Sequence, residues 1–273
     1  MSQLIIEAGR TEGQYWRDLW RYRELFYVLA WRDIAIRYKQ TAIGILWAIL
    51  QPLLTSIVLT VIFGKIAGMS SIPGVPYFLL VFVGTMPWQF FANSLTWASQ
   101  SVVGNAHLIS KVYFPRMIIP AGAVVTALAD LAVSFLLLFA IMAWYHLWPT
   151  WRMLLLPGLI LITFMAALGP GLLITALNVR YRDFRIIIPF IVQIGGYASP
   201  VGFKNPANLE HWRLLYSLNP MVGVIDGFRW AILGGESQIY LPGFLISLEM
   251  TVGLMWLGIW YFRRMERSFA DVI

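Results

Sequence analysis

The sequence predicts an all-α fold, that of a polytopic membrane protein with six transmembrane helices. Hydrophobic residues make up 59% of the 273 residues and charged residues only 12%, roughly half of the ~25% found in soluble domains. Apolar runs of the length that crosses a bilayer, about 20 residues, recur along the chain. The charged residues gather at the ends of these runs, where they determine topology. A soluble chain this apolar could not cover its own surface.

The apolar runs and the polar connections between them place the six spans. The second span is interrupted by Pro87, Gln89 and Asn93, and the short fifth span carries Pro189 and Gln193. Polar groups are excluded from lipid, so these two spans are expected to contact protein or water. The expected spans are residues 44–66, 77–99, 117–145, 153–177, 186–201 and 243–262.

Two further helical segments are predicted outside the spans. Residues 14–31 form an amphipathic helix suited to the membrane interface, or else a short surface helix packed on protein. Met221 to Leu233 is too short to cross and contains Asp226 and Arg229, which favours an external re-entrant or interfacial helical hairpin before the last span. The apolar face of the first helix comprises Tyr15, Leu19, Tyr22, Phe26 and Leu29, and its polar face Arg17, Arg21 and Glu24.

The basic residues orient the chain. The formal net charge is +7, but the positive charges form no single patch of the kind that binds nucleic acid. Fifteen of the 20 Lys and Arg residues fall in 1–43, 100–116, 178–185 and 263–273. The positive-inside rule places these segments in the cytoplasm. Both termini are therefore expected to be cytoplasmic, which requires an even number of spans.

Several kinds of chemistry are missing from the sequence. There is no cysteine, no phosphate-binding loop and no nucleophile elbow. His107, His146 and His211 lie in different connections and lack metal-ligand spacing. We therefore predict no catalytic residue, no metal site and no cofactor in this chain. A membrane-embedded glycosyl-transfer enzyme is left as an alternative without a visible catalytic cluster.

Two carboxylates lie inside predicted spans, Asp130 in the third and Glu249 in the sixth. Each costs about 2.5–3.5 kcal/mol at the centre of an isolated inserted helix, so each is a functional candidate. One interpretation is a proton relay in a proton-coupled secondary transporter. The other is that each carboxylate faces the bundle interior and pairs with a polar neighbour or a loop arginine.

Five motifs in register resemble the permease subunits of type-2 ABC exporters, in the branch that exports O-antigen, capsule and teichoic acid polysaccharides. The resemblance covers nearly the whole chain. The motifs are AWRDIAIRYKQT followed by GILWAILQPLL at 30–54, HLISKVYFPRMIIP at 107–120, NVRYRDFR at 178–185, YSLNPMVGVIDGFRWAILG at 216–234 and RRMERSFADVI at 263–273.

The resemblance implies a transmembrane, channel-forming subunit of an ATP-driven exporter that moves a lipid-linked polysaccharide across the bacterial cytoplasmic (inner) membrane. It implies a homodimer with two copies of a cytoplasmic ATPase subunit, which binds ATP and Mg²⁺, and contact with membrane lipid. A type-2 permease for drugs or small lipids would share the fold and the partner, so it stays open as an alternative, as does the proton-coupled transporter.

The resemblance also assigns roles to residues. A coupling helix in 101–114 docks on the ATPase, the N-terminal helix acts as a cytoplasmic gate, and the hairpin at 206–234 forms the external gate. Aromatic faces stack on sugar rings, so mid-span aromatic residues are candidates for the channel lining. The coupling residues are Asn105, His107, Lys111 and Tyr113; the gate and lipid-headgroup residues are Arg17, Arg21, Arg32, Arg37 and Lys39; the channel residues are Trp88, Phe90, Phe91, Trp97, Gln193 and Tyr197; the external-gate residues are Asn219, Pro220, Asp226 and Arg229.

Overall fold

The computed structural model describes residues 12–39, 42–181, 183–204, 210–234, 237 and 239–269. Every element in this part of the chain is helical, which confirms the predicted fold class. Parts of the predicted N-terminal segment 1–43, hairpin 206–234 and tail 263–273 lie outside the described residues. The elements are α1 Glu12–Arg21, α2 Arg23–Lys39, α3 Ala42–Leu59, the π-helix η1 Thr60–Ile66, α4 Tyr77–Gly104, α5 Ala106–Lys111, α6 Ile118–Trp144, the 3₁₀-helix η2 Trp151–Leu155, α7 Leu156–Arg180, α8 Phe184–Tyr197, α9 Glu210–Tyr216, α10 Pro220–Leu233 and α11 Leu241–Glu266.

Five helical stretches of the described chain are long and apolar enough to cross a membrane: α3 with η1, α4, α6, η2 with α7, and α11. The chain is therefore a polytopic membrane protein. The fifth predicted span, 186–201, corresponds to α8, which has only 14 residues. At about 1.5 Å per residue α8 covers roughly 21 Å, less than the ~30 Å hydrocarbon core, and turns at 198–203 continue the chain beyond it.

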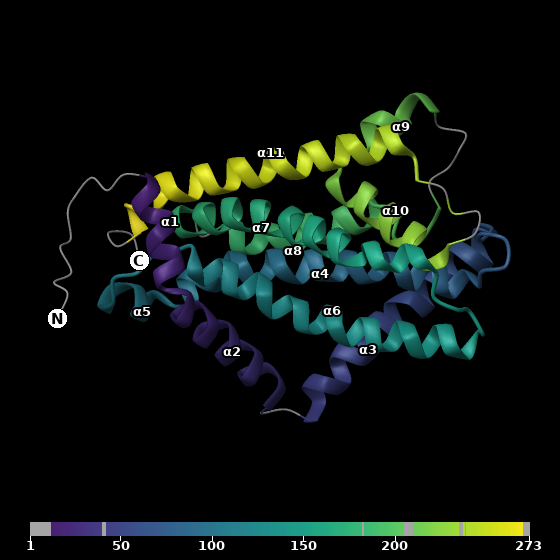
Figure 1. Ribbon diagram of the computed structural model, residues 1–273, viewed down its shortest axis with the longest axis horizontal. Coiled ribbons are helices and arrows are strands. Elements are labelled where there is room, and N and C mark those ends of the chain that lie inside the picture. The colour runs from purple at the N-terminus through teal and green to yellow at the C-terminus, as the bar shows by residue number, and fades with distance from the viewer. Residues whose placement is uncertain are drawn as a thin grey trace.

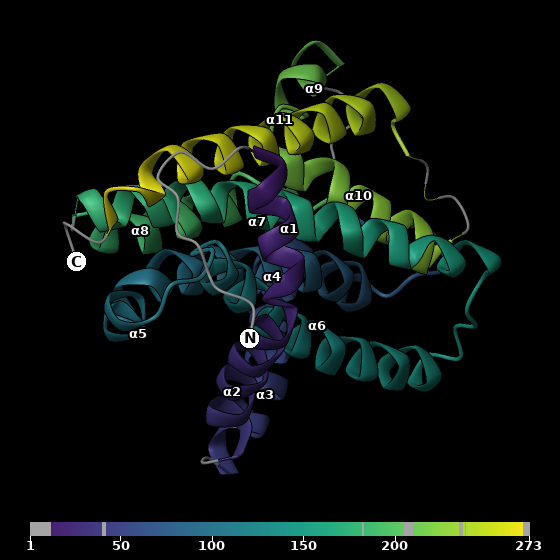
Figure 2. The same ribbon diagram turned by 60° about the vertical axis from the view of Figure 1, so that its left-hand side comes forward.

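The long helices lie side by side along the long axis of the molecule, with α4 packed between α6 and α7 and with α11 on the far side of α7 (Figures 1 and 2). α1, α5 and the end of α11 gather at one end of the bundle, and α9 and α10 at the other. α2 and α3 form a V, with the end of α2 and the start of α3 lying away from the bundle. Because α4 has neighbours on most sides, the run Leu79 to Val83 is fully buried.

α7 and α11 approach each other at two glycines. A Cβ atom added to Gly258 would lie 2.0 Å from the carbonyl oxygen of Gly169, and one added to Gly169 would lie 2.6 Å from the Met255 backbone. Small residues allow helix backbones to approach closely in lipid, where helix association depends on packing and interhelical hydrogen bonds. These two glycines therefore determine how closely α7 and α11 pack.

Side-chain hydrogen bonds join α4 to α7 near the C-terminal ends of both helices. The Thr175 hydroxyl donates to the carbonyl oxygen of Ala98 at 2.7 Å, and the Asn178 amide donates to that of Ser99 at 2.7 Å. Both side chains are buried. These hydrogen bonds between helices satisfy the two polar side chains. Lipid offers no hydrogen-bonding partners, so polar groups of spanning segments must be paired within the protein.

The N-terminal helix differs from the prediction. A single helix at 14–31 was expected at the membrane interface, but the chain forms two helices that break at Tyr22 and extend to Lys39. The predicted apolar face, including Tyr15, Leu19 and Leu29, packs against the core of the bundle. The structure therefore supports the alternative of a helix packed on protein. The predicted polar face, with the neighbouring Trp16 and Trp20, points outward.

The described part of the predicted hairpin comprises α9 and α10, and α10 lies within the helical bundle. It packs against α4, α7 and α11 and is buried along most of its length. The Asn219 side chain caps its start by accepting from the Met221 backbone N–H at 3.0 Å, and Pro220 occupies the first turn, where a missing N–H costs nothing. This capping begins α10 directly after the turn that joins it to α9.

Candidate functional site

A groove of about 620 Å³ lies between α3, α4 and α8 and the turns that follow α8. This volume falls in the range of roughly 300–1,000 Å³ that is typical of ligand sites. Aromatic side chains line its walls, and amides and a hydroxyl point into it from all three helices. The aromatic residues are Phe63, Trp88, Tyr197 and Phe203, and the polar residues from the helices are Gln51, Thr55, Gln89, Asn93 and Gln193.

Two adjacent glycines let α8 pack against an indole ring at the wall of the groove. A Cβ atom at Gly195 would lie 2.8 Å from Cη2 of Trp88, and one at Gly196 would lie 3.1 Å from its Nε1. Phe91 supports the same indole from within α4, at 5.4 Å between ring centroids. The Gly195-Gly196 pair therefore allows α4 and α8 to share one wall of the groove.

The groove contains three of the six predicted channel residues: Trp88, Gln193 and Tyr197. Phe90 is 2% exposed and borders a small neighbouring cavity instead, and Trp97 lies under the guanidinium of Arg37. Sequence reasoning missed Gln51 and Thr55. Their signal in the sequence was that both are polar residues inside the otherwise apolar first span.

A polar cluster lies directly behind the groove and includes the intramembrane carboxylate Asp130. Arg37 of α2 forms an ion pair with Asp130 at 2.8 Å, and the Tyr38 hydroxyl donates to the same carboxylate. The Asn93 amide donates to it at 3.3 Å. The guanidinium of Arg37 also lies 3.9 Å from the Trp97 ring centroid. Asp130 thus pairs with a basic residue, as one of the two interpretations expected.

The second carboxylate, Glu249, is exposed on α11. α11 packs on α7, α9 and α10, whereas α6, which carries Asp130, packs on α2, α3, α4 and α7. The structure therefore does not bring Asp130 and Glu249 together as adjacent members of a relay.

Arg229 joins α10 to the end of the groove that is formed by the turns after α8. Its side chain is 3% exposed and donates to the carbonyl oxygens of Phe203 at 2.8 Å, Val201 at 2.9 Å and Leu80 at 3.3 Å. Burial lowers the pKa of Arg229 to about 10, and the Asp226 carboxylate opposes this shift. The guanidinium therefore stays charged at neutral pH. Since Val201 and Phe203 line the groove, Arg229 holds the groove's outer wall.

We expect Arg229→Met to lower the stability of the protein by about 3 kcal/mol, because each buried carbonyl left without a donor costs about 1–3 kcal/mol. The measurement is thermal unfolding of the detergent-solubilised protein. Arg180→Met, at an exposed position at the end of α7, is the matched control and should melt near the parent. Equal melting of the two variants would contradict the anchoring role.

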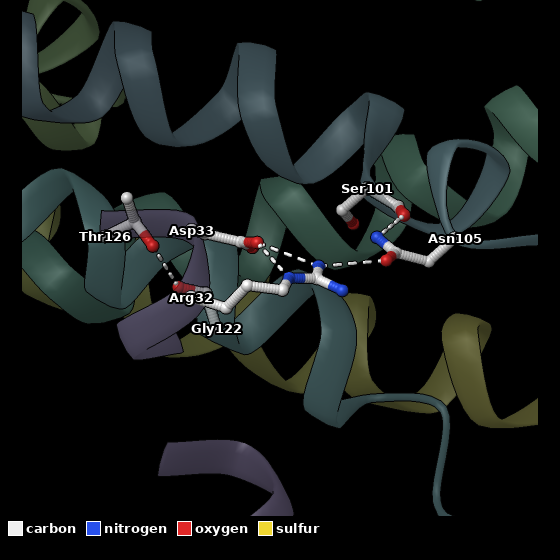
Figure 3. A network of polar contacts seen from close by, with 6 residues as sticks. All are labelled: Arg32, Asp33, Ser101, Asn105, Gly122 and Thr126. Carbon is white, nitrogen blue, oxygen red and sulfur yellow. Dashed lines mark hydrogen bonds and ion pairs between the residues drawn. The ribbon is translucent and has the colours of Figure 1, made fainter. Parts of the chain in front are cut away.

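At the end of the bundle where α1 and α5 lie, α2 is joined to the start of the short helix α5. Arg32 donates to the Asn105 side chain at 3.0 Å and pairs with Asp33 at 2.8 Å, while the Asn105 amide donates to the Ser101 carbonyl at 2.8 Å (Figure 3). Asn105 and Arg32 were predicted to contact the ATPase and lipid headgroups, respectively. The structure brings these two side chains together. His107, Lys111 and Tyr113 are exposed on α5 and the segment after it.

A second set of contacts holds α1 against the ends of α6 and α11. The Tyr15 hydroxyl donates to Glu266 at 2.8 Å, and the Arg116 backbone N–H donates to the other oxygen of that carboxylate at 2.6 Å. Burial and the nearby Glu266 carboxylate raise the pKa of Tyr15, which keeps the phenol a neutral donor. Among the predicted headgroup residues, four are exposed: Arg17, Arg21, Arg32 and Lys39.

The fold and the groove define a multi-pass membrane protein with an exposed helical element at one end of its bundle and a half-open, ligand-sized groove along it. Residues 24–233 match the model of the ABC-2 type transporter family, and because this is more than half of the chain, the chain belongs to that family.

Three curated relatives align with most of the chain. It is 29% identical over 259 residues to an O-antigen export system permease protein of Myxococcus xanthus, covering 94% of this chain and 98% of the relative. It is 26% identical over 261 residues to the protein of the same description from Klebsiella pneumoniae, covering 92% and 95%. It is also 26% identical over 245 residues to a capsule polysaccharide export inner-membrane protein of Neisseria meningitidis, covering 85% and 88%.

Proposed function

We propose that this chain is the transmembrane, channel-forming subunit of an ATP-driven exporter that moves a lipid-linked polysaccharide across the bacterial inner membrane. The groove between α3, α4 and α8 carries the proposal, because it combines aromatic faces with amide and hydroxyl groups along a membrane bundle. The relatives named as O-antigen and capsule permeases support the same cargo class. The exported polymer would become part of the cell surface, as O-antigen does in lipopolysaccharide biosynthesis.

The proposal includes a homodimer and two copies of a separate ATPase subunit that binds ATP and Mg²⁺; this chain holds no cofactor. The groove is open along one side, where α3 and α8 expose large apolar residues such as Ile57, Phe190 and Tyr197. A second copy facing this side would close the groove into a channel. Exposed His107, Lys111 and Tyr113 at the opposite, cytoplasmic end would meet the ATPase.

The cargo is tested by deleting the gene and identifying what accumulates at the inner face of the membrane. We expect a lipid-linked polysaccharide to accumulate and its surface form to disappear, with both effects reversed by the wild-type gene. Accumulation of a small lipid or retention of a drug, with surface polysaccharide unchanged, would favour the alternative permease. Transport that survives ATP depletion but stops when the proton gradient collapses would favour the proton-coupled alternative.

We expect Lys111→Glu to weaken association with the ATPase at least tenfold, because it reverses the charge of an exposed residue at the end of α5. The measurement is co-purification of the ATPase with tagged permease. Lys204→Glu makes the same charge change at an exposed position beyond α8, at the other end of the bundle, and should retain the ATPase fully. Full retention by Lys111→Glu as well would refute the docking assignment.

A further inference from the structure

We infer that the groove is a site for uncharged sugar units, so that the exported polymer presents neutral, hydroxyl-rich residues to the permease. This inference rests on the proposed function and narrows its substrate class. It is drawn from the charge, the hydrogen-bonding groups and the aromatic faces of the groove.

Charge is the first argument. None of the described residues that line the groove is acidic or basic. Three charged residues contact its lining from behind. Arg37 and Asp130 lie behind Asn93 and pair with each other at 2.8 Å. Arg229 is buried behind Val201 and Phe203, where its donors bond backbone carbonyl oxygens. An anionic sugar or a phosphate would enter a membrane-embedded site without a compensating cation, and burying an unpaired charge is strongly unfavourable. A neutral sugar avoids this penalty.

The hydrogen-bonding groups are the second argument. Four of the polar side chains are carboxamides: Gln51, Gln89, Asn93 and Gln193. Each carboxamide offers two donors and one acceptor oxygen, and a sugar hydroxyl is likewise both donor and acceptor. The four come from three different helices, so they can bond hydroxyls on more than one side of a ring. Gln193 is exposed to the groove, and Gln89 lies 3.5 Å from the Thr55 hydroxyl.

The aromatic faces are the third argument. Trp88 lies on one wall and Tyr197, which is 67% exposed, on the adjacent helix α8. An aromatic ring presents a large apolar face with a negative quadrupole, which attracts the polarised C–H groups on the face of a pyranose ring and repels carboxylates and phosphates. Aromatic faces and carboxamides together therefore select against anionic polymers.

Adding carboxylates to the groove tests the inference. We expect Gln89→Glu/Gln193→Glu to lower export of the host's surface polysaccharide at least tenfold through loss of neutral hydrogen-bond donors and acquisition of buried charge. The amount of permease and the co-purified ATPase should stay at parental levels. Gln100→Glu, an exposed position on α4 outside the groove, is the matched control and should export within twofold of the parent. Unchanged export by the double variant, present at parental levels, would overturn the inference.

Cross-linking identifies the occupant directly and separates failure of the inference from failure of the proposed function. Tyr197 is replaced by a photo-crosslinking phenylalanine derivative in the polysaccharide-producing host, and the sugar captured on the permease is analysed for uronic acids and phosphate. Capture of neutral sugar, absent from a control with the same group at Trp256 of α11, supports the inference. Capture of an acidic polymer, or of none by a variant that still exports, overturns it and leaves the proposed function standing. Unchanged surface polysaccharide after gene deletion refutes the proposed function itself.

Discussion

Gly258→Ala is expected to remove most of the folded permease from the membrane. The added Cβ atom would lie 2.0 Å from the carbonyl oxygen of Gly169 and within 3.0 Å of its Cα. Backbone cannot rotate away as a side chain can, so α7 and α11 must separate. Overpacking a close contact usually costs about 1–3 kcal/mol, and a clash between two backbones lies at or above the upper end of that range.

The measurement is the yield and the melting temperature of the purified protein, read by size-exclusion chromatography and tryptophan fluorescence. Gly253→Ala is the matched control, since it makes the same change on the same helix where an added Cβ atom meets nothing within 4 Å. We expect Gly253→Ala to match or slightly exceed the parent, because alanine is the better helix former. If both variants melted like the parent, α7 and α11 would not be packed as closely as described.

Much of the fold could be predicted because membrane spans are determined locally. A span depends on the hydropathy of about 20 successive residues, so each of the five long candidate spans coincides with an apolar run in the sequence. The close approach at Gly169 and Gly258 could not be predicted in this way. Each glycine is compatible with several partners, and the choice is made only when α7 and α11 pack together.

The candidate site was partly predictable for a related reason. Trp88, Gln193 and Tyr197 were identified because polar or aromatic residues inside a span indicate contact with something other than lipid. Gln51 and Thr55 were missed because their role depends on α3 lying beside α4. Similarly, Arg37 obeys the positive-inside rule in sequence, yet in the structure it pairs with Asp130, 93 residues further along the chain.

α2 joins the exposed helix α5 to the wall of the groove. Near its middle, Arg32 bonds Asn105 at the start of α5, and near its end Arg37 pairs with Asp130, which in turn accepts from the groove residue Asn93. A rigid helix with polar contacts at both places transmits displacement from one to the other. The pair Arg37–Asp130 is therefore the contact through which a shift of α2 reaches the groove.

Breaking this pair from one side is expected to be more damaging than removing it entirely. Arg37→Met leaves the Asp130 carboxylate, which is 13% exposed, without its cation, and loss of one partner of a buried pair costs about 3–5 kcal/mol. Asp130→Leu removes the carboxylate partner of the Arg37 guanidinium. Arg37→Met/Asp130→Leu removes both charges, so it should melt at a higher temperature than either single variant.

The double variant also distinguishes a structural carboxylate from a proton relay. If Asp130 serves to hold α2, the double variant should recover a large part of the export that Asp130→Leu loses, because the cation that lost its carboxylate is also removed. A relay requires a titratable group at that position, and leucine cannot bind a proton. Export that stays abolished in a double variant that folds and retains the ATPase would therefore contradict the structural role and favour proton transfer through Asp130.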